Sequence, residues 1–266
     1  MRSIAGAPEL RPLGLARAAF GLVFLLRTTP VLAAFHPTFL TGSGWLGWPD
    51  AGWHVAALEL PRSVIELLVI ARTAGALAVM LGFHTRIAGL VAGIAGYLVL
   101  AQDPFGYFHH LHLLYLGAIL FAVVDADAAC AVRLVPGRSP RSSLLLMRAF
   151  VASIYVWAAI GKLASEWGTG RALALFRESG ALDRALVGGL LATPVRCAIV
   201  EIAVITGELA IGAGLLWPRT RRVALGAAIA MHLGLEIVAH VDSIGWQMLA
   251  LLLVFTRSAP LRPATQ

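Results

Sequence analysis

Apolar runs of membrane-spanning length recur along the whole chain, and this feature constrains the fold more than any other. Of the 266 residues, 59% are hydrophobic and only 13% are charged, and the mean hydropathy is +0.83. This composition is far more apolar than that of a soluble domain. In a bilayer, backbone polar groups must be paired within the protein, which favours helices for runs of this length. The sequence therefore predicts an all-α, polytopic transmembrane helical bundle.

About eight spans are predicted, in a single transmembrane domain that covers residues 1–266. They are expected at 13–34, 64–82, 87–102, 108–124, 144–162, 196–217 and, as a pair, 223–256. The last stretch is too long for one crossing and is interrupted between His240 and Gly245. Between the spans, residues 35–63 form a long loop rich in Trp and His that suits the membrane interface, and 163–195 is expected to hold one short interfacial helix.

The distribution of arginine predicts the orientation. With the N-terminus in the cytoplasm, four arginine-bearing loops or tails fall inside, as the positive-inside rule requires. These arginines are Arg86, Arg133, Arg138, Arg141, Arg219, Arg221, Arg222, Arg257 and Arg262. We therefore expect both termini to be cytoplasmic in a multi-pass protein of a bacterial cytoplasmic membrane. The outer segment 163–195 fits the rule poorly, because it also holds Arg171, Arg177 and Arg184, which Glu166, Glu178 and Asp183 offset. The net charge of +7 and pI near 10.4 then indicate contact with membrane lipid, and no nucleic-acid partner is expected.

This topology predicts that polar residues from three hairpin tips gather at the outer face of the membrane. They are Asp103, His109, His110, Lys162, Glu166, Trp167, His240 and Asp242. Polar groups that meet at one depth in a membrane protein indicate a functional site more strongly than any one of them does alone.

Lys162 is the only lysine in the chain, beside 20 arginines. Lysine can lose its proton when it is partly desolvated, whereas arginine stays charged. Two interpretations follow: a basic amine at a reactive site, assisted by His109 or His110, or a lysine that extends its ammonium to the interface at a helix end.

Further polar residues lie within the predicted spans. His232, Glu236 and His240 share one face of the seventh span, where a buried polar network is favoured over a metal site. Glu201 and Glu208 need partners in the bilayer, and we expect ion pairs with arginines of other spans that fix the packing. The candidate arginines are Arg17, Arg27 and Arg72. No metal is predicted, and the two cysteines are too few for a thiolate site.

The stretch around Lys162 resembles a known family signature. Tyr155 leads into Gly161-Lys162-Leu163-x-x-Glu166-Trp167-x-x-Gly170, which looks like the motif of the vitamin K-dependent γ-carboxylase superfamily. The bacterial members are HTTM (horizontally transferred transmembrane) domain proteins. A helix that opens with His109-His110 and closes with Val124-Asp125-Ala126, and the entry Leu15-Ala16-Arg17-x-x-x-Gly21, are similar to the same family.

The resemblance implies a chemistry and a site. The eukaryotic carboxylase deprotonates a reduced naphthoquinone, which reacts with oxygen and drives proton removal from glutamate and capture of carbon dioxide. By resemblance, Lys162 is the catalytic base and His110, rather than His109, assists it. Tyr155, Glu166, Trp167 and Gly170 would bind the quinol. Independently of the resemblance, the polar residues within the spans predict an intramembrane polar network of Arg17, Glu201, Glu208, His232, Glu236 and His240.

Cofactor and substrate follow from the same comparison. The implied cofactor is a reduced naphthoquinone, either vitamin K hydroquinone or menaquinol, drawn from the membrane quinone pool. The chain ends soon after its last span, so we expect a small-molecule or peptide substrate rather than a protein gripped by a large extracytoplasmic domain. The alternative is a non-enzymatic protein, such as a quinone-associated subunit or a small transport module, that uses the interior Glu, Arg and His residues.

Overall fold

The computed structural model describes residues 8–33, 60–101, 109–135, 140–239 and 243–256. These segments are helical almost throughout, as the sequence predicts, and they contain one isolated β-bridge, between Leu182 and Ala239. Contacts divide the chain into two units, with the boundary between Leu144 and Leu145. We describe each unit by itself.

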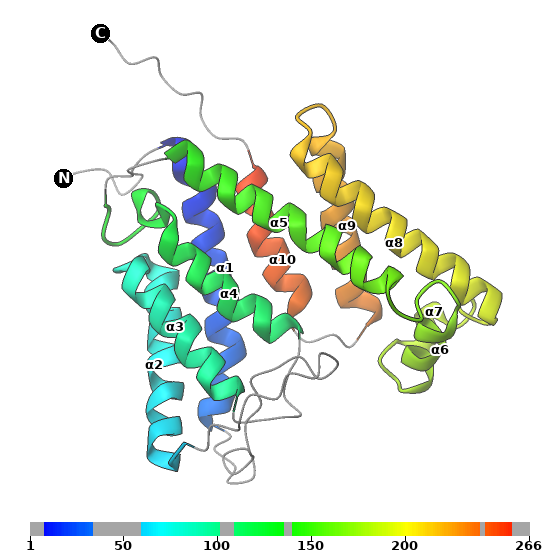
Figure 1. Cartoon of the computed structure of the whole chain (residues 1–266), viewed down its shortest axis with the longest axis horizontal. Coiled ribbons are helices and arrows are strands. Elements are labelled where there is room, and N and C mark those ends of the chain that lie inside the picture. The colour runs from blue at the N-terminus through cyan, green and yellow to red at the C-terminus, as the bar shows by residue number, and fades with distance from the viewer. Residues whose placement is uncertain (1–7, 34–59, 102–108, 136–139, 240–242, 257–266) are drawn as a thin grey trace. The chain divides into compact units, whose positions relative to one another are not determined.

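The first unit is built from four helices that lie side by side (Figure 1). The helices are α1 (Arg11–Ala33), preceded by the 3-10 turn η1 (Pro8–Leu10), α2 (Arg62–Leu81), α3 (Thr85–Leu100) and α4 (His109–Val123), followed by the 3-10 turn η4 (Ala126–Ala128). Helix α2 is capped by Gly82, whose φ of 68° lies in the left-handed region, which glycine adopts without steric strain. The first four predicted spans are thus confirmed as helices, each to within two residues.

Small residues let the helices of the first unit approach closely. A methyl group on Gly89 of α3 would lie 2.4 Å from the carbonyl oxygen of Ala118 in α4, and one on Gly96 would lie 2.2 Å from the ring of Tyr115. This face of α3 therefore packs backbone against backbone, which is how membrane helices gain dispersion contacts where lipid offers no hydrophobic driving force.

Arg17 links α1 to two other segments of the first unit. Its side chain is fully buried in α1, yet it donates to carbonyl oxygens of two other segments. Nη1 bonds to Val79 and, at 2.9 Å, to Met80; Nε bonds to Ala126 at 3.2 Å, and Nη2 bonds to Cys130. Arg17 thus compensates carbonyls left open at the end of α2 and in the turn after α4.

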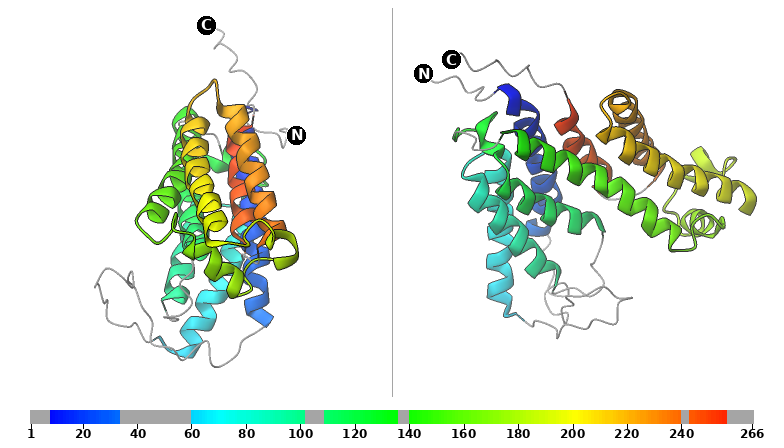
Figure 2. Two further views of the ribbon diagram at one scale, coloured as in Figure 1. Left: turned by 90° about the vertical axis from the view of Figure 1, so that its right-hand side faces the viewer. Right: turned by 45° about the horizontal axis from the view of Figure 1, so that its top comes forward.

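The second unit contains the rest of α5 (Pro140–Leu163), then α6 (Arg171–Glu178), α7 (Arg184–Val187), α8 (Pro194–Leu216), α9 (Arg221–Val238), α10 (Ile244–Leu252) and the 3-10 turn η5 (Leu253–Phe255). Helices α8 and α9 form a hairpin in Figure 1 and in both views of Figure 2. Helix α8 begins with Thr193, whose hydroxyl caps the N–H of Arg196, and with Pro194 at its first position.

Between α5 and α10, two details differ from the prediction and one agrees with it. Helix α5 starts at Pro140 rather than 144, because proline suits a first helical turn and the polar residues after it do not end the helix. The segment 163–195 holds two short helices, α6 and α7, instead of one. The expected break in the last apolar stretch is confirmed, since α9 ends at Val238 and α10 begins at Ile244.

Three of the described helices are long and apolar enough to cross a membrane: Arg62–Leu81, Arg141–Leu163 and Pro194–Leu216. Shorter apolar helices occur at Thr85–Leu100, Leu111–Val123 and Ile244–Phe255. The count of eight crossings, the cytoplasmic termini and the single-domain assignment stay predictions.

Candidate functional site

Lys162 lies at the end of α5 and forms an ion pair with Glu208 of α8. Its Nζ atom is 2.7 Å from Oε1 and 2.9 Å from Oε2 of Glu208. The side chains of Lys162 and Glu208 are 20% and 10% exposed, respectively. The ammonium is therefore held by both carboxylate oxygens, and the lysine side chain stays partly exposed. This geometry is much more specific than that of a lysine that merely reaches for the interface.

Trp167 provides a second contact for the Lys162 ammonium. The Nζ atom lies 5.1 Å from the centroid of the indole ring, within cation–π range. The half-buried indole also makes an edge contact with Phe176, at 6.1 Å between centroids. Trp167 packs against an apolar cluster made of Leu173, Leu182, Val187, Leu191, Cys197 and Ala239. Lys162 is thus placed between a carboxylate and an aromatic face, and both are anchored in the second unit.

Glu201 of α8 fixes the segment that joins Trp167 to α6. Its carboxylate is fully buried and accepts the backbone N–H groups of Gly168 and Gly170 at Oε2, at 2.6 and 2.7 Å, and that of Leu173 at Oε1, at 2.8 Å. Gly170 is the residue that caps α6, so Glu201 supplies a negative charge to the open N–H groups of that helix from another element.

This arrangement requires glycine at both ends of the segment Gly168-x-Gly170. Gly168 and Gly170 have φ values of 91° and 85°, a region that side chains other than glycine rarely adopt. At Gly170 a methyl group would in addition lie 2.2 Å from the carbonyl oxygen of Pro194. The backbone thereby turns both N–H groups toward Glu201 and brings the segment against the start of α8.

The spacing of polar residues on α8 matches the path of the segment 155–173. Glu208 and Glu201 are two turns apart and belong to one buried stripe of the helix. A methyl group on Gly212 would contact Val156, Glu208 contacts Lys162, and Glu201 contacts Gly168 and Gly170. The segment therefore runs antiparallel along α8. The glutamates are the partners of the family-like motif, so the expectation that they pair with Arg17, Arg27 or Arg72 is wrong.

Tyr155 and His232 form a separate buried pair. The Tyr155 hydroxyl lies 2.9 Å from Nε2 of His232 in α9, and the ring centroids are 5.7 Å apart. Both side chains are almost fully buried. Tyr155 precedes Lys162 by two helical turns and so belongs to the same face of α5. Tyr155, which the family resemblance assigns to quinol binding, therefore contacts His232, which the sequence assigns to the intramembrane polar network.

The other predicted site residues do not take part in these two pairs. Glu166 is exposed and pairs with Arg171 at 3.0 Å, a surface ion pair of little energetic weight. Glu236 lies against the backbone of Gly245 at the start of α10. His109 and His110 open α4 in the first unit, and their proximity to Lys162 stays a prediction. His240, Asp103 and Asp242 lie outside the described residues.

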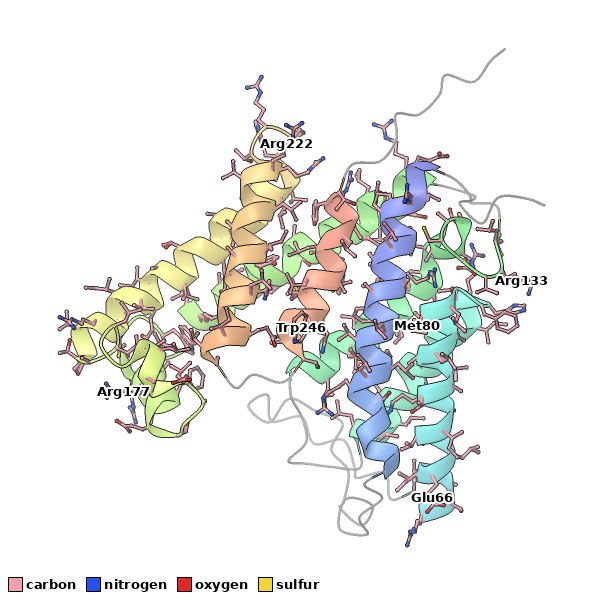
Figure 3. All side chains as sticks on the ribbon, turned by 180° about the vertical axis from the view of Figure 1, so that it is seen from behind. Glu66, Met80, Arg133, Arg177, Arg222 and Trp246 are labelled. Carbon is pink, nitrogen blue, oxygen red and sulfur yellow. The ribbon has the colours of Figure 1, made fainter. Side chains whose placement is uncertain are left out.

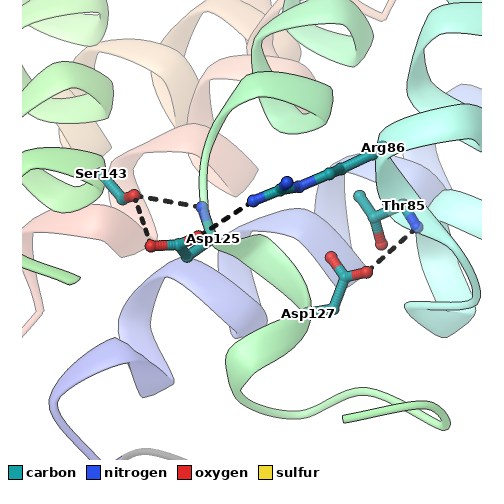
Figure 4. A network of polar contacts seen from close by, with 5 residues as sticks. All are labelled: Thr85, Arg86, Asp125, Asp127 and Ser143. Atoms are coloured by element: carbon teal, nitrogen blue, oxygen red, sulfur yellow. Dashed lines mark hydrogen bonds and ion pairs between the residues drawn. The ribbon is translucent and has the colours of Figure 1, made fainter. Parts of the chain in front are cut away.

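The first unit contains a polar network at the end of α4 (Figure 4). Arg86 pairs with Asp125 at 3.3 Å, Ser143 bonds to the carboxylate and the N–H of Asp125, and Asp127 accepts the N–H of Thr85 at 3.2 Å. Asp125 belongs to the Val124-Asp125-Ala126 pattern, so this part of the family resemblance marks a structural junction. The neighbouring pocket, of about 240 Å³, is lined among others by Arg86 and Arg133, arginines of two loops predicted to face the cytoplasm.

Together, these features define a helical membrane protein with a lysine–glutamate pair at the end of one apolar helix. Comparison with protein families identifies it further: the HTTM domain matches residues 9–259, nearly the whole chain and both units. The chain therefore belongs to the HTTM-domain family, which is related to the vitamin K-dependent γ-carboxylases. No curated protein and no solved structure matches it.

Sequence reasoning missed the pairing of Lys162 with Glu208 and the role of Glu201 as a distant helix cap. A signal was present, because the seven-residue spacing of the glutamates equals two helical turns and the glycine-flanked motif offers open N–H groups.

Proposed function

We propose that the protein is a membrane enzyme that oxidises a reduced naphthoquinone, with the Lys162–Glu208 pair as its acid–base group. The observation that supports this most is the short contact of the only lysine with both oxygens of a nearly buried carboxylate. A structural ion pair would be served as well by arginine, which the chain uses at its other 20 basic positions.

The residues present fit such a molecule. Trp167 offers a half-buried aromatic ring, and Lys162, whose side chain is 20% exposed, places its Nζ atom beside this ring. Trp167 would contact the apolar ring of the quinol, and Lys162 would face its hydroxyl group. When bound, a reduced naphthoquinone supplies an acidic hydroxyl and two electrons, for which molecular oxygen is the acceptor.

The ion pair gives the lysine a way to act as a base. An ammonium cannot accept a proton, but transfer of one proton from Nζ to Oε1 of Glu208 yields a neutral amine beside a neutral carboxylic acid. With a quinol bound, the Nζ lone pair would accept the proton of its hydroxyl, and the carboxylic acid of Glu208 would release the first proton to water, which restores the ion pair.

The test is quinol oxidation by the purified protein in nanodiscs. Wild type should oxidise menaquinol in the presence of oxygen. Lys162→Arg keeps the charge but not the titratable amine, and Glu208→Gln keeps the volume but not the proton acceptor, so each should reduce the rate about 100-fold or more, as expected for loss of a general base. Arg171→Lys, which alters only the surface pair with Glu166, is the matched control. Normal rates in Lys162→Arg would refute the proposal.

A non-enzymatic role, as a quinone-associated subunit or transport module, is the second proposal, and it would use buried polar side chains such as the Tyr155–His232 pair. Because Glu208 is bonded to Lys162, a phenotype at Glu208 fits both roles. Glu236→Gln separates them: it should impair the non-enzymatic role and leave quinol oxidation intact.

A further inference from the structure

Two arginines are buried inside the described helices of the first unit, and they differ in how many of their nitrogens form hydrogen bonds. Arg17 uses all three of its nitrogens on carbonyl oxygens. Arg72 of α2 is 3% exposed, and its Nη1 donates to the Tyr115 hydroxyl at 3.3 Å. In the part of the chain that the structure describes, Nε and Nη2 of Arg72 are buried and have no hydrogen-bond partner.

The two open nitrogens of Arg72 belong to one edge of the guanidinium. Nε–H and one N–H of Nη2 point the same way, and this edge is the one that binds two oxygens of an oxyanion in parallel. The Tyr115 contact occupies Nη1 and thereby holds the plane of the guanidinium. Arg72 therefore offers an oriented fork.

The surroundings of Arg72 are ordered and aromatic. The Tyr115 ring stacks edge-on with Tyr97 at 5.4 Å, and the Tyr97 hydroxyl lies 2.8 Å from Nδ1 of His112. The ring of Phe24 in α1 also contacts Tyr115, at 5.8 Å between centroids. Among the described residues, Arg72 forms no ion pair. A guanidinium does not lose its charge, so the open edge of Arg72, which none of the described carboxylates approaches, attracts an anion.

We propose that Arg72 is a binding site for the carboxylate of an amphiphilic ligand with an apolar body, such as a fatty acid. The Nε–Nη2 edge offers two parallel donors, which match the two oxygens of one carboxylate. Arg72 lies halfway along the 20-residue helix α2, ~15 Å from its first residue. The apolar and aromatic contacts of α1, α3 and α4 suit the ligand's body. This site is independent of Lys162 and of quinol chemistry.

The test measures binding of laurate to wild-type protein in nanodiscs, by calorimetry. Laurate should bind saturably, and its methyl ester, which has the same chain but no anionic carboxylate, should bind at least tenfold more weakly. Arg72→Lys keeps the charge but loses the fork, so it should weaken laurate binding about tenfold. Arg62→Lys, the same change at the exposed start of α2, is the control and should bind as wild type does.

Each outcome decides the matter. Equal binding of laurate and methyl laurate, or unchanged binding in Arg72→Lys, would overturn the proposal. Competition by phosphatidylglycerol without any effect of laurate would show a phosphodiester site and would also overturn it. If Arg72→Lys does not fold, the comparison of acid and ester on wild-type protein still decides, through the rise in melting temperature that each produces. Failure here leaves quinol oxidation untouched, because that assay does not involve Arg72.

Discussion

At the scale of single residues, the second unit depends on charges that find their partner across helices. Glu201 is the clearest case, since a fully buried carboxylate accepts three backbone N–H groups. Hydrogen bonds to a charged acceptor are stronger than neutral ones, and removing the acceptor leaves buried donors unsatisfied. The position of Trp167 beside Lys162 therefore rests on a residue that does not touch Lys162.

We predict that Glu201→Gln destabilises the protein by about 3 kcal/mol, because the amide NH₂ group would face backbone donors and the charge would be lost. The free energy of unfolding in mixed micelles measures this effect. Glu66→Gln serves as the control, since Glu66 is in an exposed ion pair with Arg62, and it should change stability by less than about 0.5 kcal/mol. Equal effects of the two changes would contradict the role given to Glu201.

For the Lys162–Glu208 pair, we predict that the single change Lys162→Met costs about 2 kcal/mol, because it leaves a nearly buried carboxylate without its counter-charge. The double change Lys162→Met with Glu208→Leu should restore most of the lost stability while activity stays absent, because two apolar side chains can replace a buried pair at little cost. A double variant that is less stable than Lys162→Met would show that the pair is needed for folding itself.

At the scale of elements, glycines decide where helices end and how closely they pass. The family-like motif contains glycines of two kinds. Gly161 lies within α5 and has no atom within 4 Å of an added methyl group, whereas Gly170 combines a positive φ with a methyl position 2.2 Å from Pro194 O. Only the second is required by the structure.

We therefore predict opposite outcomes for two alanine substitutions in one motif. Gly170→Ala should destabilise the protein by about 3 kcal/mol or more, through backbone strain and overlap with α8. Gly161→Ala should be neutral or stabilising by up to about 1 kcal/mol, because alanine favours helix at an open position. Thermal unfolding followed by circular dichroism reports both. A stable Gly170→Ala variant would contradict the backbone geometry described here.

At the scale of the whole molecule, the membrane orientation of each unit can be tested separately. Figure 3 labels charged residues at both ends of the helices in each unit. Arg133 lies beyond the end of α2 that carries Met80 and opposite Glu66, and Arg222 lies at the α8–α9 turn, opposite Arg177 on α6. If the positive-inside rule holds, Arg133 and Arg222 face the cytoplasm.

We predict the labelling of single cysteines placed at these positions, in a background with Cys130 and Cys197 replaced by serine. A membrane-impermeant maleimide should react with Glu66→Cys and Arg177→Cys in intact cells. It should react with Arg133→Cys and Arg222→Cys only after permeabilisation. Labelling of Arg222→Cys from outside would overturn the predicted topology of the second unit.

The sequence by itself determined the helical membrane class, the positions of the helices and the break before α10. Apolar length, turn residues and glycine are local signals, and membrane helices satisfy their backbone locally. The family resemblance likewise rested on the short motif around Lys162. Only the tertiary structure decided the partners: Glu208 for Lys162, Glu201 for the glycine segment, His232 for Tyr155, and carbonyl oxygens for Arg17. Pairings across helices depend on rotation and depth, which side-chain periodicity leaves open. From the sequence alone, any buried arginine was a possible partner for any buried glutamate, and only the packing of the helices showed which partner each residue has.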